Sequence, residues 1–195
     1  MRKELIRKSF SNRRNLLNYD DFEKRTKLLI KKTIELITQV QPKCVHCFLP
    51  IESKLEINTF PIIEFCLSQD IQVVVPVTNF SDNSMKSANF NFNTPLTVKK
   101  YNIPEPTNPN IVNDEIIDFV ITPLLAFDLN GFRVGYGKGF YDRTFSFKIS
   151  NRHSRPLLVG LAHECQLTET FPVASWDVRL DAVITTEKIY RPDTA

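Results

Sequence analysis

Residues 131–145 (GFRVGYGKGFYDRTF) combine glycines with charged side chains in a way that suits phosphate binding. The chain has 5 glycines in 195 residues, whereas average usage of about 7% would give roughly 14. Four of the five lie in this stretch, at positions 131, 135, 137 and 139. Glycine permits a positive φ and lets backbone N–H groups converge on an anion without a Cβ in the way. The stretch therefore predicts a loop whose backbone contacts a ligand.

Charged side chains lie between these glycines. Arg133 and Lys138 carry the full positive charges that suit phosphate. A helix beginning near Gly137–Gly139 would add free N–H donors, and Asp142 in its first turn could hold Mg²⁺. Together these residues predict a site for phosphate and metal. The alternative is a tight strand-to-helix turn whose charges are solvated.

Two familiar phosphate motifs do not fit the stretch. A Walker A loop needs Ser or Thr after its lysine, and here Gly139 follows Lys138. The dinucleotide fingerprint G-x-G-x-x-G is replaced by the order G-x-G-x-G. From spacing alone, the type of phosphate loop stays open.

Composition indicates a soluble globular protein of one domain. The hydrophobic content is 42% and the mean hydropathy is −0.20. No apolar run reaches the roughly 18 residues of a membrane span, and no secretory signal is visible near Met1. We expect a cytoplasmic protein that is a monomer and contacts no membrane.

The net charge of +3 is unevenly distributed. Residues 1–32 contain 11 Lys or Arg and 4 Asp or Glu, whereas the remainder contains 14 and 18. A basic front end could bind a polyanion such as a nucleotide or RNA, or it could be a solvated helix face. A mitochondrial transit peptide is a third reading, and Glu4 argues against it.

Four cysteines are expected to be free thiols in a reducing compartment. The run Cys44-Val45-His46-Cys47 resembles half of a zinc site, but no second pair of ligands exists in the chain. Its alternating pattern favours a strand.

Helical and strand patterns alternate along the chain. Helices are predicted over residues 2–18, 20–39, 58–69 and 138–147, and strands over 43–49, 71–77, 116–127, 155–163 and 181–186. Residues 78–98 read as loops with one or two short strands, and 102–110 as an irregular loop. This order predicts a single α/β domain (1–195) with a helical part (1–40) and a core (43–187) built on a largely parallel sheet. The glycine loop follows the apolar strand 116–127, and ligands bind at such carboxyl ends.

These residues resemble the conserved motifs of a known protein family. GFRVGYGKGFYD (131–142), preceded by PLLAFD (123–128), is similar to the signature of the 5-formyltetrahydrofolate cyclo-ligases, also called methenyltetrahydrofolate synthetases. Further matches in the family's order are Lys3 and Arg7, EINT (56–59), YNIPEP (101–106), VGLAHECQL (159–167) and DAVITTE (181–187). The resemblance covers nearly the whole chain.

The resemblance implies a fold and a reaction. The fold would be a three-layer architecture of the NagB/RpiA/CoA transferase type. The reaction would convert 5-formyltetrahydrofolate and ATP into 5,10-methenyltetrahydrofolate, ADP and phosphate, with Mg²⁺ as cofactor. The folate could be polyglutamylated.

The resemblance also assigns roles to residues. Lys138, Arg133 and Tyr141 would be catalytic, and Asp142 and Asp181 would hold the metal. Glu56 would accept hydrogen bonds from the pterin ring and Tyr101 would stack on the folate, with Tyr136, Gly137, Lys138, Gly139 and Phe140 also contacting it. ATP would be bound by Lys3, Arg7, Arg133, Val134, Gly135, Tyr136, Gly137, Lys138, Gly139, Phe140 and Tyr141.

Some roles stay open. Position 136 varies in the family between Arg and aromatic residues, so Tyr136 could contact phosphate, folate or neither. Leu49 and Ile51 are both candidates for the apolar partner of the pterin. His163 replaces a residue that is often aromatic in the family, and a lone histidine after an apolar strand is expected to be structural. The basic helix at the front of the chain could be mobile without ATP.

Two rival functions remain. An RNA-binding module could use the basic front end and the aromatic residues between the glycines, but the other 163 residues are acidic overall. A sugar-phosphate isomerase on the same sheet would not consume ATP, and fold analogy alone does not exclude it. We expect no nucleic-acid partner.

Overall fold

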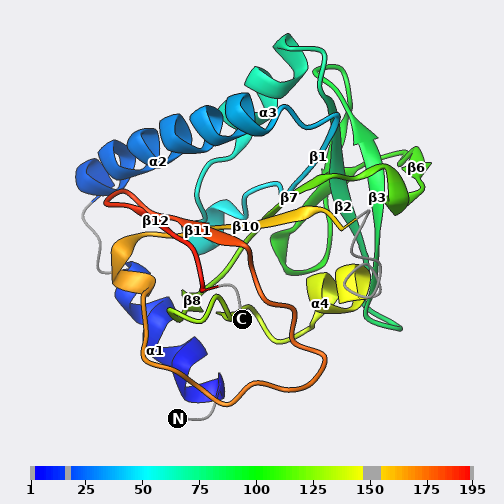
Figure 1. The fold of residues 1–195 in the computed structure, drawn as a ribbon. Helices are drawn as coiled ribbons and strands as arrows, with labels where there is room; N and C mark the ends of the chain where they lie inside the picture. The colour runs from blue at the N-terminus through cyan, green and yellow to red at the C-terminus, as the bar shows by residue number, and fades with distance from the viewer. Residues whose placement is uncertain (1–2, 16–18, 147–154, 194–195) are drawn as a thin grey trace.

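An eight-stranded sheet forms the centre of the computed structural model, which describes residues 3–15, 19–146 and 155–193 (Figure 1). The strand order is β12-β11-β10-β7-β1-β2-β3-β6. The five strands from β11 to β2 run parallel, and β12, β3 and β6 are antiparallel additions at the two edges. The predicted α/β fold with a largely parallel sheet is therefore confirmed.

The strands of this sheet are short. They are β1 (Cys44–Cys47), β2 (Gln72–Asn79), β3 (Ser84–Phe90), β6 (Ile111–Val112), β7 (Phe119–Thr122), β10 (Leu157–Leu161), β11 (Ala182–Ile184) and β12 (Ile189–Tyr190). Two small antiparallel pairs lie outside it: β4 (Leu96–Val98) with β5 (Pro104–Pro106), and β8 (Ala126–Phe127) with β9 (Arg133–Val134).

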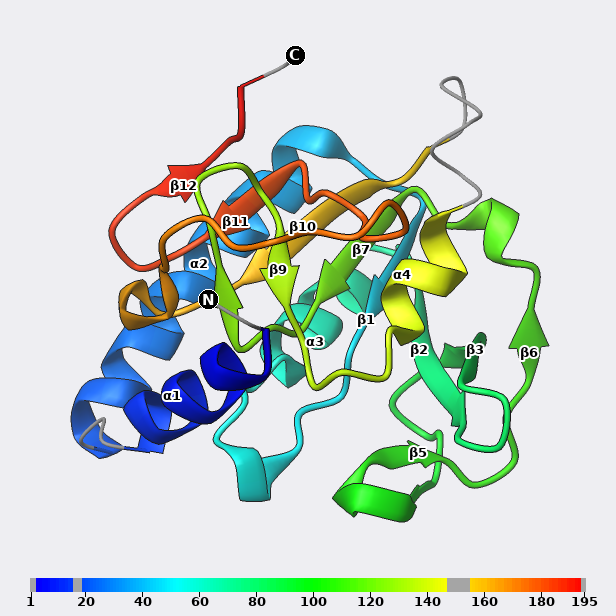
Figure 2. The ribbon, with the colours of Figure 1, turned by 90° about the horizontal axis from the view of Figure 1, so that it is seen from below.

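Four α-helices of the described residues cover the sheet. They are α1 (Lys3–Asn15), α2 (Tyr19–Val40), α3 (Phe60–Ser68) and α4 (Phe140–Phe145). Short 3₁₀ turns are η1 (Glu52–Lys54), η2 (Lys100–Asn102), η3 (Asp114–Ile116) and η5 (Glu164–Gln166). Figure 1 shows α2 and α3 on one side of the sheet, and Figure 2, viewed from below, shows α1, β9 and α4 in front of it. No helix in the described ranges is both long and apolar enough to cross a bilayer.

Alternation along the strands divides the core into two layers. Side chains facing α2 and α3 include Val45, Cys47, Phe119, Ile121, Val159 and Leu161. Their neighbours in the same strands face the other side, where Phe127 and Phe145 cover them; these neighbours include Cys44, Val120 and Leu158. Because successive side chains of a strand point to opposite faces, each strand serves both layers. Cys44, His46 and Cys47 are thus buried parts of β1.

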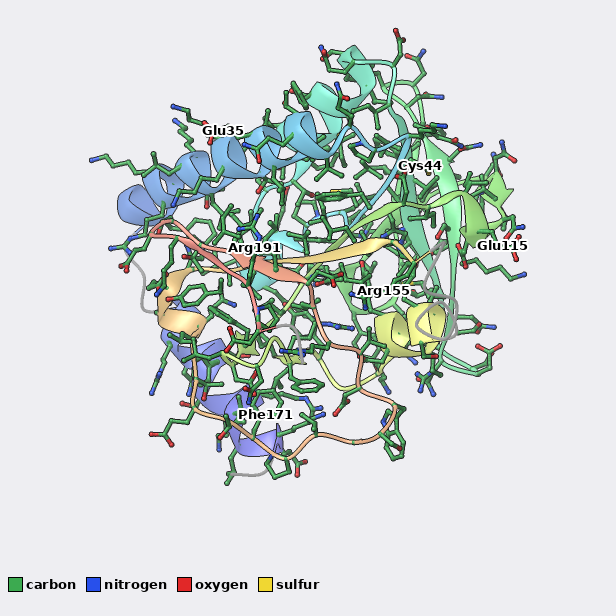
Figure 3. The ribbon with its side chains drawn as sticks, in the orientation of Figure 1. Glu35, Cys44, Glu115, Arg155, Phe171 and Arg191 are labelled. Atoms are coloured by element: carbon green, nitrogen blue, oxygen red, sulfur yellow. The ribbon has the colours of Figure 1, made fainter. Side chains whose placement is uncertain are left out.

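A third, smaller cluster attaches α1 to the β8–β9 pair. Ile6 and Phe10 are buried against Ala126, Val134 and Phe171. In Figure 3, Phe171 lies beside α1, on the opposite side of the sheet from Glu35 of α2. The first helix is therefore packed on the rest of the molecule, with Lys3 and Arg13 over the rings of Phe171 and Phe10 at the border of that cluster. The predicted end of this helix, at residues 16–18, lies outside the described residues.

The largest departure from the predicted elements concerns residues 116–127. The strand ends at Thr122, and a separate pair begins at Ala126. Proline at position 123 cannot donate a hydrogen bond to a ladder, so the chain leaves the sheet there. The predicted loop 102–110 includes β5, and β12 has no counterpart among the predicted strands. The predicted helix over 138–147 is shorter in its described part, where α4 begins at Phe140; residue 147 lies outside the described residues.

Candidate active site

A cavity of about 780 Å³ opens where β1 and β7 end. Phe48 and Pro123, which follow these two strands, line its floor together with the whole of residues 133–143. The predicted position at the carboxyl ends of parallel strands is therefore where the glycine loop lies. Every predicted site residue is described, and all of them line this cavity except Asp181.

Residues 135–139 of the loop join β9 to α4. Gly137 has a φ of +93° and Gly139 a φ of +65°. Residues that have a Cβ rarely adopt this backbone conformation. Gly139 is the N-cap of α4, which is six residues long. Lys138 between these glycines is exposed on the cavity wall. The loop therefore combines an unusual backbone with a solvent-facing cation.

Helix α1 brings two cations to this loop. Arg7 donates from Nε to the carbonyl oxygen of Gly135 at 2.9 Å. Its guanidinium also packs on Gly137, where a Cβ would lie 3.1 Å from Arg7 Cζ. Lys3, one turn earlier, forms an ion pair with Asp177 and also lines the cavity. The helix thus brings both predicted phosphate-binding cations to the cavity lining.

Arg133 ties three segments together beneath the loop. Its guanidinium is buried and donates to Asp142 Oδ1 and to the carbonyl oxygen of Val178, both at 2.9 Å. Val178 in turn donates its backbone N–H to Asp142 Oδ1 at 3.0 Å. This triangle fixes β9, α4 and residues 177–178 relative to one another.

The two predicted metal carboxylates occupy different places. Asp142 lines the cavity, and both of its hydrogen bonds use Oδ1. Asp181 lies at the amino end of β11, where it accepts from the Leu158 N–H and pairs with Arg155. Arg155 lies just before β10 (Figure 3). The prediction that Asp181 lies with Asp142 at the site is not met, because the amino ends of β10 and β11 are away from the cavity.

Asp177 is the carboxylate that the structure brings to the cavity instead. It precedes Val178, the residue bonded to Asp142, and it lines the cavity beside Lys3. Sequence reasoning missed it because two aspartates, Asp177 and Asp181, lie four residues apart before the same strand. The fold separates them, since Asp181 is committed to the β10–β11 pairing.

Glu56 is buried at another part of the cavity, with 8% of its surface exposed. Its Oε2 accepts from the Ile51 N–H and its Oε1 from the Tyr136 hydroxyl, both at 2.7 Å. The Lys54 ammonium lies 4.0 Å from the centre of the Tyr136 ring. Tyr136 is therefore bonded to the carboxylate predicted to bind the pterin, and whether it also contacts a ligand stays a prediction.

Aromatic side chains line the adjoining wall. Tyr101 is half exposed and its ring lies 4.9 Å from that of Phe80, which in turn contacts Phe140 at 5.3 Å. Leu49 and Ile51 are both buried and both line the cavity. The wall thus offers aromatic and apolar surfaces for a planar ligand.

Tyr141 also lines the cavity. Its hydroxyl oxygen is buried and has no hydrogen-bond partner among the described residues. Burial raises the pKa of Tyr141 well above 10.0, so the phenol stays protonated and can only act as a neutral donor or acceptor. A buried hydroxyl without a partner is costly, and a bound ligand could satisfy it.

Comparison with known proteins decides the family. A profile of the 5-formyltetrahydrofolate cyclo-ligase family matches residues 1–186. The chain belongs to this family. The 5-formyltetrahydrofolate cyclo-ligase of Escherichia coli K12 is 37% identical over 77% of this chain and 82% of its own length. The Saccharomyces cerevisiae cyclo-ligase is 26% identical over 93% and 94%.

A solved cyclo-ligase-family structure has the same fold. The Aquifex aeolicus 5,10-methenyltetrahydrofolate synthetase superimposes with a TM-score of 0.80 and 28% identity, covering 100% of this chain and 95% of that one. The glycine loop by which the family was predicted is therefore part of a shared fold, and the chain spans most of the length of its relatives.

His163 lies outside the main cavity of this cyclo-ligase-family protein. It is buried, its ring lies 4.8 Å from that of Phe22, and its backbone N–H donates to Gln166 Oε1 at 2.8 Å. Gln166 also donates to the carbonyl oxygens of Leu124 and Leu125. The Gln166 contacts support the chain after β7, and a structural role for His163 stays a prediction.

Proposed function

We propose that this protein converts 5-formyltetrahydrofolate into 5,10-methenyltetrahydrofolate with ATP and Mg²⁺, releasing ADP and phosphate. The observation that carries the proposal is a single cavity that holds both a buried carboxylate, Glu56, and a glycine loop flanked by Lys3, Arg7 and Lys138. The carboxylate suits a ring edge rich in N–H donors, and the cations suit a triphosphate. Relatives named 5-formyltetrahydrofolate cyclo-ligase agree with this chemistry.

The reaction proceeds in two steps. The formyl oxygen attacks the γ-phosphorus of ATP, and ADP leaves with the electron pair of the broken P–O bond. The formyl carbon becomes iminium-like, and N10 of the same folate attacks it. Phosphate then leaves with the C–O bond pair and the N10 proton is released. The protein supplies positioning and neutralises charge on the transferring group.

The chain's own residues divide this work. Lys138 and Arg7 both line the cavity, and we assign to both the neutralisation of phosphate oxygens. We assign to the hydroxyl of Tyr141, a cavity-lining residue, the donation of a hydrogen bond to an oxygen of the bound reactants, which would give this buried group a partner. Tyr136 must release Glu56 before the pterin binds there.

The donor set suits Mg²⁺. In the described residues no three His, Cys, Asp or Glu side chains come together as a metal site, but Mg²⁺ is usually held by one or two carboxylates, substrate phosphates and water. Asp142, whose Oδ1 accepts from Arg133 and Val178, and Asp177 are carboxylates that line the cavity near the loop. When bound, the metal would neutralise the charge that develops on the transferring phosphoryl group.

The arrangement of α1 argues for a nucleotide over RNA. The helix buries Ile6 and Phe10 and directs Lys3 and Arg7 to a cavity, so these cations face an enclosed ligand. A monomeric state, a polyglutamylated substrate and the absence of a nucleic-acid partner remain predictions.

A coupled assay tests the proposal. Purified protein is given 5-formyltetrahydrofolate, ATP and Mg²⁺, and the near-ultraviolet absorbance of methenyltetrahydrofolate is followed together with ADP release. We expect one ADP for each folate converted and no conversion without ATP. Folded protein that produces no methenyltetrahydrofolate would overturn the proposal, and conversion without ATP consumption would point to different chemistry.

A further inference from the structure

Trp176 is a large apolar side chain left exposed at the mouth of the cavity. It is the chain's single tryptophan, 70% of its surface is exposed, and it is among the cavity-lining residues. Val173, its neighbour on the same wall, is 44% exposed. An indole that is exposed and lines a cavity offers a large aromatic face to a ligand ring.

The segment that carries Trp176 is held firmly. Asp177 accepts from the Ala174 N–H through Oδ2 at 2.6 Å, and its own N–H donates to the Ala174 carbonyl oxygen at 3.0 Å. These reciprocal bonds close a turn with Trp176 inside it. On the far side, Val178 is fixed by Asp142 and Arg133. The indole is therefore presented by a braced turn at a defined place.

The position of this turn identifies which ligand the indole meets. Asp177 pairs with Lys3, and Lys3 lies one helical turn from Arg7, which is bonded to Gly135. Tyr136, the next residue of the loop, is bonded to Glu56. The loop thus has two flanks: one with Glu56 for the pterin, and one with Lys3, Arg7 and Asp177 for phosphate. Trp176 belongs to the phosphate flank.

We propose that Trp176 stacks on the purine base of the bound nucleotide. The inference rests on the proposed function, because it takes the triphosphate to lie along Lys3, Arg7 and the glycine loop. A base joined to that triphosphate extends beyond the phosphate cations, where the indole face is the exposed aromatic surface of the turn. Stacking of a base on an aromatic side chain contributes strongly to binding and needs no hydrogen-bond pattern.

The single tryptophan makes a direct measurement possible. Intrinsic fluorescence of the full chain is titrated with Mg²⁺–ATP in the absence of folate, and in parallel with Mg²⁺–tripolyphosphate, which has the phosphates without the base. We expect ATP to quench and shift the emission and tripolyphosphate to leave it nearly unchanged. Equal responses to both probes, or a response to 5-formyltetrahydrofolate but none to ATP, would overturn the inference.

Variants separate stacking from a general structural effect. We expect Trp176→Ala to raise KM for ATP about tenfold, a size typical of one lost stacked base, and Trp176→Phe to raise it less than threefold. KM for 5-formyltetrahydrofolate should change less than twofold in both. The matched control is Phe92→Ala, which removes an aromatic side chain that is 68% exposed and outside the cavity lining. Equal ATP KM values for the wild type and Trp176→Ala would exclude stacking.

Failure of this inference and failure of the proposed function give different results. If the protein converts folate but its fluorescence ignores ATP, the base lies elsewhere and the inference is wrong. If ATP quenches the indole but no folate is converted, the nucleotide site stands and the proposed reaction is wrong.

Discussion

The hydroxyl of Tyr136 donates a 2.7 Å hydrogen bond to Oε1 of Glu56, so a loop residue occupies the carboxylate that the family resemblance assigns to the pterin. The second oxygen of Glu56 is bonded to the Ile51 N–H at 2.7 Å. A buried carboxylate needs such partners, since leaving it unpaired is costly. The glycine loop therefore supplies one of the hydrogen bonds of Glu56, and in the proposed function the substrate's own donors would replace the phenol.

Replacing Tyr136 with phenylalanine tests this competition. Without the hydroxyl, the substrate no longer has to displace a donor from Glu56, and we expect KM for 5-formyltetrahydrofolate to fall about threefold to tenfold with kcat within twofold of the wild type. Loss of the hydrogen bond to Glu56 Oε1 should also lower the free energy of unfolding by about 1 kcal/mol. Steady-state kinetics and urea unfolding measure both. A higher KM would mean instead that the hydroxyl binds the folate.

The Mg²⁺ dependence of the reaction rate tests which of Asp142, Asp177 and Asp181 binds the metal. Asp142→Asn and Asp177→Asn keep an oxygen that accepts hydrogen bonds but lose the charge, and each should raise the Mg²⁺ concentration for half-maximal rate about tenfold. Asp181→Asn is the matched control: its Mg²⁺ requirement should not change, while loss of the Arg155 pair lowers the free energy of unfolding by about 1 kcal/mol or less. An altered Mg²⁺ requirement in Asp181→Asn alone would restore the original assignment.

Lys138 is expected to act on phosphate without supporting the fold. Its side chain is exposed on the cavity wall, so Lys138→Ala should unfold like the wild type. Loss of a charge aimed at the transferring group should lower kcat/KM for ATP about 100-fold or more. Lys86→Ala, which removes an exposed lysine of β3 outside the cavity lining, provides the control. Kinetics unchanged by the Lys138 substitution would remove this residue from the phosphate role.

Local patterns in the sequence were sufficient to predict the main strands and the glycine loop. The apolar runs around Val45, Val74 and Val159 predicted the buried parallel strands, because strands covered on both faces read as continuous apolar segments. The glycine loop was found for a similar reason, since four glycines in a glycine-poor chain are a strong local signal. Pro123 also carried a local signal for the break after β7, and giving it more weight would have corrected the predicted strand 116–127.

Long-range contacts decided what the sequence left open. The sequence around Asp177 and Asp181 does not indicate which of them lies at the cavity. Asp177 pairs with Lys3, 174 residues earlier in the chain, whereas Asp181 pairs with Arg155 and accepts from the β10 backbone. The contact between Tyr136 and Glu56 joins residues 80 positions apart. Such pairs depend on how the strands are ordered in the sheet, and a single sequence does not give that order.

Two alanine substitutions, at Gly131 and Gly135, test whether a glycine of the stretch 131–145 is needed for the fold or for ligand binding. Gly131 has a φ of +82°, and a Cβ there would lie 2.5 Å from Pro192 Cγ and 2.8 Å from the Leu180 carbonyl oxygen. Gly131→Ala should therefore lower the free energy of unfolding by about 2 kcal/mol or more.

At Gly135 a Cβ would meet no atom of the described residues within 4 Å, and the fold gives no reason for glycine there. Gly135→Ala should unfold at the same denaturant concentration as the wild type. If the backbone at this position approaches the ligand, the added methyl group should lower kcat/KM for ATP at least tenfold. Full activity in this variant would favour the alternative of a simple strand-to-helix turn, whereas lost activity with unchanged stability requires close contact between the loop backbone and a ligand.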